Sequence, residues 1–159
     1  MFLKPDYNLK NIYAIDLNEL SAKGIKAILF DLDSTLMASK SGKYTQETLD
    51  WLNKVRENFF IGVVSNNKNE EYIKKVKSVS DFPLLFRAGK PSTKEVKKFL
   101  EEQNLTPDVC ALVGDRPLTD ILCGKKLGCI TILVDSITAD TEAKIVRLAR
   151  KLERVFIKK

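Results

Sequence analysis

The chain has 159 residues, about the size of one domain, and a formal net charge of +6. It contains no histidine, which excludes Ser-His-Asp triads and the usual His-containing zinc sites. No apolar run approaches the roughly 18 residues of a membrane span, and the first 20 residues carry scattered charges, unlike a signal peptide. Three cysteines without a Cys-x-x-Cys pair indicate free thiols. We therefore expect one cytosolic domain, residues 1–159, whose acid–base chemistry uses carboxylates, lysine or tyrosine.

The first part of the chain, residues 1–24, carries large apolar side chains without a helical or strand period. We predict that this segment wraps the core.

From there on, strand-like runs alternate with segments of helical period, which is typical of a parallel sheet with helices on its faces. One helix is expected to begin at the capping-box pair Asn67 and Glu70, and another, over 118–127, has Pro117 in its first turn. The pattern predicts an α/β protein with a five-stranded parallel sheet. The predicted strands are 26–31, 60–65, 84–86, 110–114 and 130–134.

Two carboxylates follow the first of these strands. Asp31 and Asp33 are two residues apart in an extended segment, so both side chains point into the same region beyond the strand's carboxyl end. Two such charges repel each other by about 4 kcal/mol at roughly 4 Å when the effective dielectric constant is near 20. A divalent metal ion is the obvious partner for them.

Other strands also end in residues suited to phosphate chemistry. These residues are Ser65, Asn66, Lys90, Asp115 and Asp120. Each alone has an ordinary structural explanation as a helix cap, a surface lysine or a turn. Because the carboxyl ends of parallel strands share one edge of the sheet, their joint placement favours a functional site there.

Other motifs that use acidic or phosphate-binding residues do not fit. An EF-hand would need Gly and Glu where this chain has Leu36 and Gly42, and the nucleotide P-loop pattern is absent. A response-regulator receiver domain would not place Asp-x-Asp on its first strand.

The polar motifs resemble, in order and spacing, the four motifs of the haloacid dehalogenase (HAD) superfamily. They are Asp31-Leu32-Asp33-Ser34-Thr35, Val64-Ser65-Asn66-Asn67, Lys90-Pro91 and the segment from Gly114 to Asp120. The chain is more closely similar to the YqeG-type phosphatases of subfamily IIIA, which are related to phosphatidylglycerophosphate phosphatases. The resemblance implies a three-layer Rossmann-like fold. Ser34 departs from the pattern, because many relatives carry Asn at this position.

The resemblance also implies roles for the site residues. Asp31 would be the nucleophile that forms an aspartyl-phosphate, and Asp33 the general acid and base. Mg²⁺ would be held by the Asp31 side chain, the Asp33 main-chain carbonyl and Asp115. Asp120 would either bind the metal through water or orient Lys90.

The phosphoryl group would be bound by a second set of residues. Lys90 would neutralise the phosphate and the nucleophile together. Ser65, the main-chain amide of Asn66 and Thr35 would hold the phosphoryl oxygens.

A cap domain is not expected over this site. Only about ten residues separate Leu36 from the next helix, and residues 66–89 hold one helix and one strand, against the roughly 50 residues that a separate folding unit needs. The site should therefore admit bulky substrates.

The C-terminal segment 141–159 contains seven basic and two acidic residues with apolar residues at helical spacing. This pattern predicts a basic amphipathic helix that either packs on the sheet or contacts an anionic membrane, nucleic acid being a weaker alternative. Taken with the family resemblance, the open site and this basic segment favour a cytoplasmic phosphatase for a membrane-presented lipid phosphate such as phosphatidylglycerophosphate, with peripheral contact at the membrane surface as a further expectation. The alternatives are a soluble metabolite, a nucleotide, a phosphoprotein, a nucleic-acid end, or a non-catalytic binding module.

Overall fold

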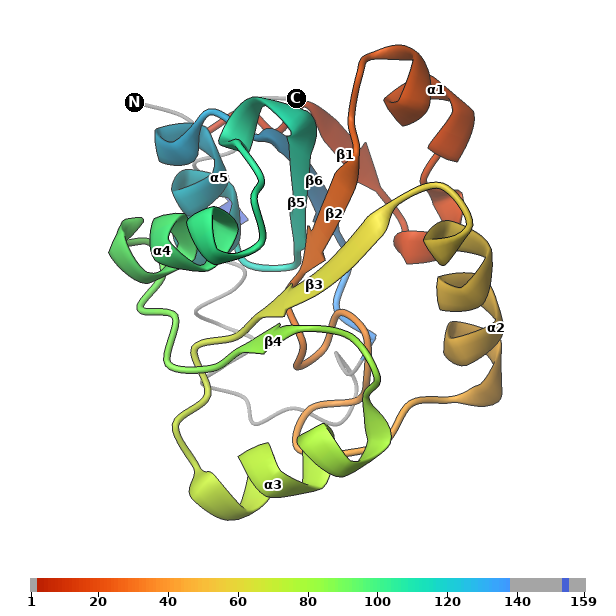
Figure 1. The fold of residues 1–159 in the computed structure, drawn as a ribbon, viewed down its shortest axis with the longest axis vertical. Helices are drawn as coiled ribbons and strands as arrows, with labels where there is room; N and C mark the ends of the chain where they lie inside the picture. Colours follow the sequence, from red (N-terminus) through yellow and green to blue (C-terminus); the bar gives the residue numbers. More distant parts are fainter. Residues whose placement is uncertain (1–2, 138–152, 155–159) are drawn as a thin grey trace.

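A computed structural model of the chain describes residues 3–137 and 153–154. Its strands form one parallel sheet in the order β1-β6-β5-β2-β3-β4 (Figure 1). The strands are β1 (Tyr7–Leu9), β2 (Ala27–Phe30), β3 (Phe60–Val64), β4 (Leu84–Leu85), β5 (Cys110–Gly114) and β6 (Ile130–Val134). The α-helices are α1 (Leu17–Ala22), α2 (Gln46–Arg56), α3 (Glu70–Val79), α4 (Lys94–Glu102) and α5 (Leu122–Leu127). Short turns are η1 (Ile12–Ala14), η2 (Pro107–Val109) and the π-helical η3 (Pro117–Ile121).

The α/β class and the parallel sheet are confirmed, but the sheet has six strands instead of five. The additional strand, β1, lies in the segment that was predicted only to wrap the core, and Tyr7 pairs with Ile132 of β6. Beside it, the Asp6 carboxylate accepts hydrogen bonds from the Thr131 main-chain N–H (2.8 Å) and hydroxyl (3.0 Å). A strand of three half-exposed residues is too short for its alternation to be detected.

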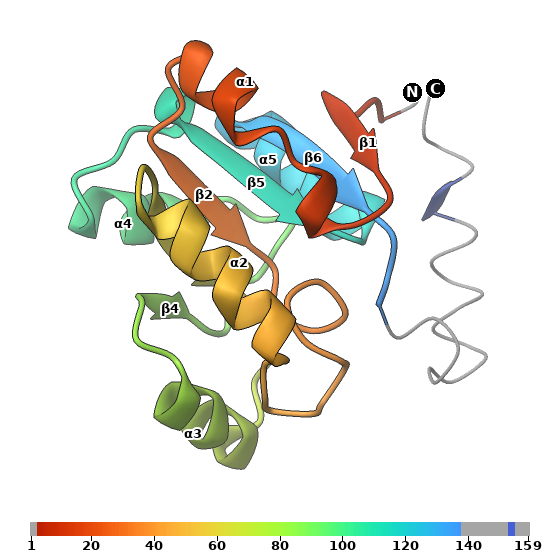
Figure 2. The same cartoon turned by 90° about the vertical axis from the view of Figure 1, so that its right-hand side faces the viewer.

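Helices cover both faces of the sheet, because successive residues of β2 point to opposite sides. Phe30 packs in one buried cluster with Leu52 of α2, and Leu29 packs in a second cluster with Phe99 of α4. Figure 2 shows α2 on one side of the sheet and α4 and α5 on the other. Burying both faces is what allows β2 to consist entirely of apolar residues.

Two helix starts differ from the predictions. Asn69, not Asn67, caps α3 by accepting a hydrogen bond from the Tyr72 main-chain N–H at 2.9 Å. The helix predicted over 118–127 begins with the π-helical turn η3, which has Pro117 in its first turn as expected, and continues as α5.

The predicted basic helix 141–159 lies outside the described residues, apart from Glu153 and Arg154. Between β2 and α2, and between β3 and α4, the chain forms only loops, α3 and β4, without an inserted domain. Within residues 3–137 and 153–154, no helix has the length and apolar character needed to cross a membrane.

Candidate active site

The predicted polar residues meet beyond the carboxyl ends of the central strands. They line one pocket, whose described residues are Asp31, Asp33, Ser34, Ser39, Ser65, Asn66, Asn67, Lys90, Asp115, Arg116, Thr119 and Asp120. Of the residues predicted to act here, Thr35 alone is missing from this lining.

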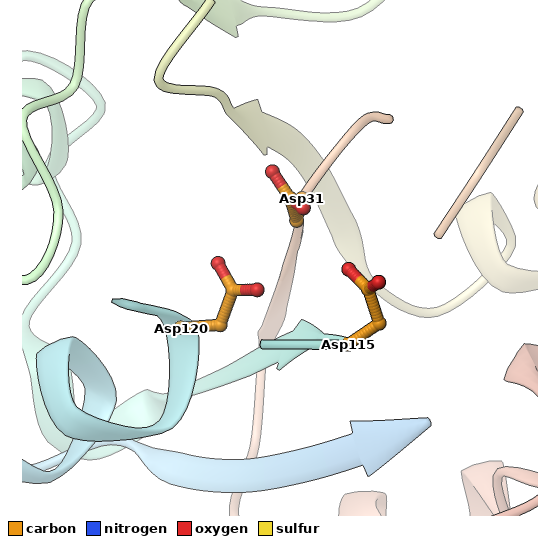
Figure 3. A group of neighbouring side chains, drawn as sticks. All are labelled: Asp31, Asp115 and Asp120. Carbon is orange, nitrogen blue, oxygen red and sulfur yellow. The ribbon is translucent and has the colours of Figure 1, made fainter. Parts of the chain in front are cut away.

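Three carboxylates from separate elements converge in this pocket. Asp31 follows β2, Asp115 follows β5 and Asp120 lies on η3, and one oxygen of each is within 4.8 Å of the others (Figure 3). Burial, together with the charges of Asp120 and Asp115, raises the pKa of Asp31 to about 8. Oxygen donors that repel one another in this way suit a hard divalent cation such as Mg²⁺, so the residues present fit a metal ion.

Lys90 is the buried cation of the site. Its Nζ donates hydrogen bonds to Oδ1 of Asp31 at 3.1 Å and to Oδ1 of Asp120 at 2.5 Å. Burial opposes its charge, but the carboxylates of Asp120 and Asp31 raise the pKa of Lys90 above its usual range. The lysine therefore carries a fixed positive charge beside Asp31.

The loop that carries Lys90 is held by the side chain of Asn66. The Lys90 main-chain N–H donates to Oδ1 of Asn66 (2.8 Å), and Nδ2 of Asn66 donates to the Lys90 main-chain oxygen (2.9 Å). The side chain of Asn66 thus positions Lys90. The contact predicted between the main-chain amide of Asn66 and phosphate stays a prediction.

Asp120 is tightly enclosed by its own loop. Its Oδ2 accepts a hydrogen bond from the Arg116 main-chain N–H at 3.2 Å. A Cβ atom on Gly114 would lie 2.2 Å from the carboxyl carbon of Asp120. Only glycine at position 114 leaves room for Asp120 in this place.

Thr35, which was predicted to hold a phosphoryl oxygen, is not among the described residues that line the pocket. It is buried, and its hydroxyl donates to Oδ1 of Asp115 at 3.3 Å. The contact places Thr35 where it orients Asp115, behind the pocket surface that a phosphoryl group would meet.

Asp33 lies apart from the three converging carboxylates, in a set of hydrogen bonds of its own. Its Oδ1 accepts from the Tyr72 hydroxyl at 2.6 Å and from the Lys40 main-chain N–H at 3.1 Å, and its Oδ2 accepts from Nδ2 of Asn67 at 3.3 Å. The Ser65 hydroxyl, also buried in the pocket, accepts from the Asn67 main-chain N–H at 3.1 Å. Tyr72 was not among the predicted site residues, because nothing in its helical spacing points toward an active site.

The sequence of the chain matches characterised families. Residues 1–138 match the family model described as mitochondrial PGP phosphatase. The chain is 31% identical over 153 residues to a probable phosphatase YqeG of Bacillus subtilis, with 96% of this chain and 88% of that protein covered. It is 29% identical over 170 residues to phosphatidylglycerophosphate phosphatase 1 of Arabidopsis thaliana, where 99% of this chain covers 48% of the plant protein, about half its length.

The fold is also similar to solved structures. One is a HAD phosphatase from Thermococcus onnurineus (TM-score 0.57, 12% identity, 82% of this chain and 97% of that one covered). Another is a HAD-family enzyme from Bacteroides thetaiotaomicron, solved as a mutant with magnesium and inorganic phosphate (TM-score 0.58, 15% identity, 76% and 97% covered). At these identities the likeness concerns the fold. The sequence matches show that the chain belongs to the mitochondrial PGP phosphatase family and is a phosphatase.

Proposed function

We propose that the protein hydrolyses a phosphomonoester through an aspartyl-phosphate on Asp31, with Mg²⁺ in the site, and that the substrate is a lipid phosphate such as phosphatidylglycerophosphate. The observation that carries the chemistry is the position of Asp31, which contacts Lys90 and lies within 4.8 Å of Asp115 and Asp120. A nucleophile needs such surroundings because a carboxylate and a phosphate repel each other unless positive charge lies between them.

In the first step, a carboxylate oxygen of Asp31 attacks phosphorus and the bond from phosphorus to the leaving oxygen breaks. Asp33 gives its proton to that oxygen, so an alcohol departs and the phosphoryl group stays on Asp31. Lys90 stabilises the charge that builds up on the phosphoryl oxygens. The Ser65 hydroxyl lines the same pocket and donates a hydrogen bond to one of them.

In the second step, Asp33 takes a proton from water, and the resulting hydroxide oxygen attacks phosphorus. The bond between phosphorus and Asp31 breaks, which releases inorganic phosphate and regenerates the carboxylate of Asp31 and the protonated carboxyl group of Asp33. Tyr72 and Asn67, which hydrogen-bond the carboxylate of Asp33, keep it at one place in the pocket between the two proton transfers.

Asp31, Asp115 and the main-chain carbonyl of Asp33 would hold the Mg²⁺ ion, with Asp120 close enough to bind it through water. When bound, the ion supplies the positive charge that lets an anionic phosphate approach three carboxylates.

Three observations support the lipid substrate. The plant relative is named for phosphatidylglycerophosphate. The described loops around the pocket contain no inserted domain that would exclude a bulky substrate. The sequence places seven basic residues in segment 141–159, which favours anionic membrane surfaces. These observations favour a lipid over the soluble substrates considered above.

The test measures phosphate release from phosphatidylglycerophosphate in mixed micelles and from glycerol 3-phosphate, each with Mg²⁺ and with EDTA. We expect preference for the lipid, loss of activity in EDTA, and a loss of at least about 1,000-fold in Asp31→Asn. Asp50→Asn, a change to an exposed carboxylate on α2, is the matched control and should keep wild-type activity. Acid-quenched enzyme should carry a hydroxylamine-labile phosphoryl group on Asp31.

Activity that survives Asp31→Asn would overturn the nucleophile assignment. Equal or better turnover of glycerol 3-phosphate would overturn the lipid substrate while leaving the phosphatase chemistry in place.

A further inference from the structure

A second cation faces the pocket. Arg116 lines it directly after Asp115, and among the described residues of the lining only Lys90 shares its positive charge. Lys90 is engaged by Asp31 and Asp120. The side chain of Arg116 is 39% exposed, so it is accessible to a ligand entering from solvent.

A buried carboxylate from a distant part of the chain holds this arginine. Oε2 of Glu153 accepts hydrogen bonds from Nη2 (2.8 Å) and Nε (3.2 Å) of Arg116, while its Oε1 accepts from the Leu118 main-chain N–H at 3.1 Å. The Glu153 side chain is only 6% exposed. Because the guanidinium is planar, fixing Nε and Nη2 also fixes the direction of Nη1.

The contacts leave a donor for a ligand. Arginine carries five N–H groups, and within the described part of the chain Nη1 of Arg116 makes no hydrogen bond. A buried glutamate that fixes one edge of a guanidinium makes its other edge a pre-organised site for an anionic group.

We infer that Arg116 binds a second anionic group of the substrate, a phosphodiester one glycerol unit away from the phosphomonoester that is hydrolysed. The inference rests on the proposed function, because phosphatidylglycerophosphate carries these two groups in this arrangement. Arg116 is thus a specificity-determining residue, and Glu153 is the residue that positions it.

The experiment uses a matched pair of soluble substrates, so that membrane binding plays no part. Glycerophosphoglycerophosphate, the deacylated head group, carries the phosphodiester, and glycerol 3-phosphate does not. The wild-type protein should show a kcat/KM at least about tenfold higher for the first, as expected for a charge-assisted hydrogen bond.

Arg116→Gln should lower kcat/KM for glycerophosphoglycerophosphate by about tenfold, chiefly through KM, and lower that for glycerol 3-phosphate by less than about threefold. Glu153→Gln should act in the same direction with a smaller rise in KM. The control is Arg56→Gln. Arg56 lies at the end of α2 and pairs with Asp81 at the surface, so its replacement should leave kcat/KM unchanged for both substrates.

Measuring the Mg²⁺ affinity of the Arg116→Gln protein distinguishes a role in substrate specificity from a merely structural one. Arg116 adjoins Asp115, so an arginine that only shaped this loop would weaken Mg²⁺ binding and lower kcat for both substrates equally when replaced. That result, or a wild-type protein without preference for the diester, would overturn the inference and leave the phosphatase function standing. A wild-type protein that hydrolyses phosphatidylglycerophosphate in mixed micelles but neither soluble compound would likewise overturn the inference. One that hydrolyses none of the three would refute the proposed function itself.

Discussion

Two sets of ion pairs in this molecule have similar donor–acceptor distances and very different surroundings. In the active site, Lys90 donates to Asp120 at 2.5 Å and to Asp31 at 3.1 Å, and the Lys90 side chain is 1% exposed. On the outer surface, Arg56 donates to Asp81 at 2.7 and 3.0 Å, with side chains 40% and 76% exposed. These distances alone do not show how much either set of ion pairs contributes to the stability of the fold.

The difference lies in what water would do if one partner were removed. Water reaches Arg56 and Asp81 in either case, so that pair adds little to stability. A carboxyl group left in the buried cluster without its cation would have to hold a charge away from solvent or take up a proton, and either destabilises the folded protein. The cluster therefore depends on its cations, both Lys90 and the proposed metal.

The largest expected effect follows from removing the buried cation. Lys90→Met leaves the carboxylate of Asp120 buried without its lysine, and we expect a loss of about 3–5 kcal/mol in the free energy of unfolding without metal. Saturating Mg²⁺ should recover part of this loss, because it supplies positive charge to the same carboxylates. Urea denaturation with EDTA and with Mg²⁺ measures both. A loss that is small and insensitive to Mg²⁺ would contradict this account of the cluster.

Breaking the half-buried ion pair between Arg116 and Glu153 should lower the free energy of unfolding by an amount between those of the buried and exposed pairs. Glu153→Leu removes the acceptor of the Leu118 N–H and of two arginine N–H groups. We expect a loss of about 1–3 kcal/mol, measured by the same denaturation. A neutral or stabilising result would mean that apolar packing replaces these hydrogen bonds fully.

The binding of Mg²⁺ should depend on pH through Asp31. With its pKa raised to about 8 in the metal-free protein, this carboxyl is protonated below that pH and must lose its proton to bind the ion. Affinity should therefore weaken as pH falls from 8 to 6, by at most about tenfold per unit, or roughly 1.4 kcal/mol. Titration calorimetry in buffers of different ionisation enthalpy should show proton release at pH 7, and an affinity independent of pH would contradict the assignment.

The smallest effect is expected at the exposed pair. Arg56→Met should cost less than about 1 kcal/mol in the free energy of unfolding, and added salt should reduce the difference further. Phosphatase activity should not change. If this substitution destabilised the protein as much as Lys90→Met, burial would not be what separates the two pairs.

The sequence predicted the parts of the molecule that depend on neighbouring residues. An apolar run followed by Asp-x-Asp located β2 and Asp31, and the parallel arrangement brought the ends of β2, β3 and β5 to one pocket. These features follow from side-chain alternation and from the geometry of parallel sheets.

What the sequence did not predict depends on contacts between distant residues. Tyr72 is 39 positions from Asp33, and Glu153 is 37 from Arg116. The strand β1 is secured by Asp6 and Thr131, which are 125 positions apart. No local periodicity records such pairs, because they form only when separate elements have packed.

The space beside Gly114 has a consequence for anyone who wishes to inactivate this protein cleanly. Since a single methyl group there would overlap the carboxyl group of Asp120, Gly114→Ala would push that acid out of line without deleting any functional side chain. Because Lys90 hydrogen-bonds to both Asp120 and Asp31, a displaced Asp120 would also shift Lys90 and alter its contact with Asp31. The absence of a side chain at Gly114 thus determines where Asp120 lies, and through Asp120 where the other charged groups of the pocket lie.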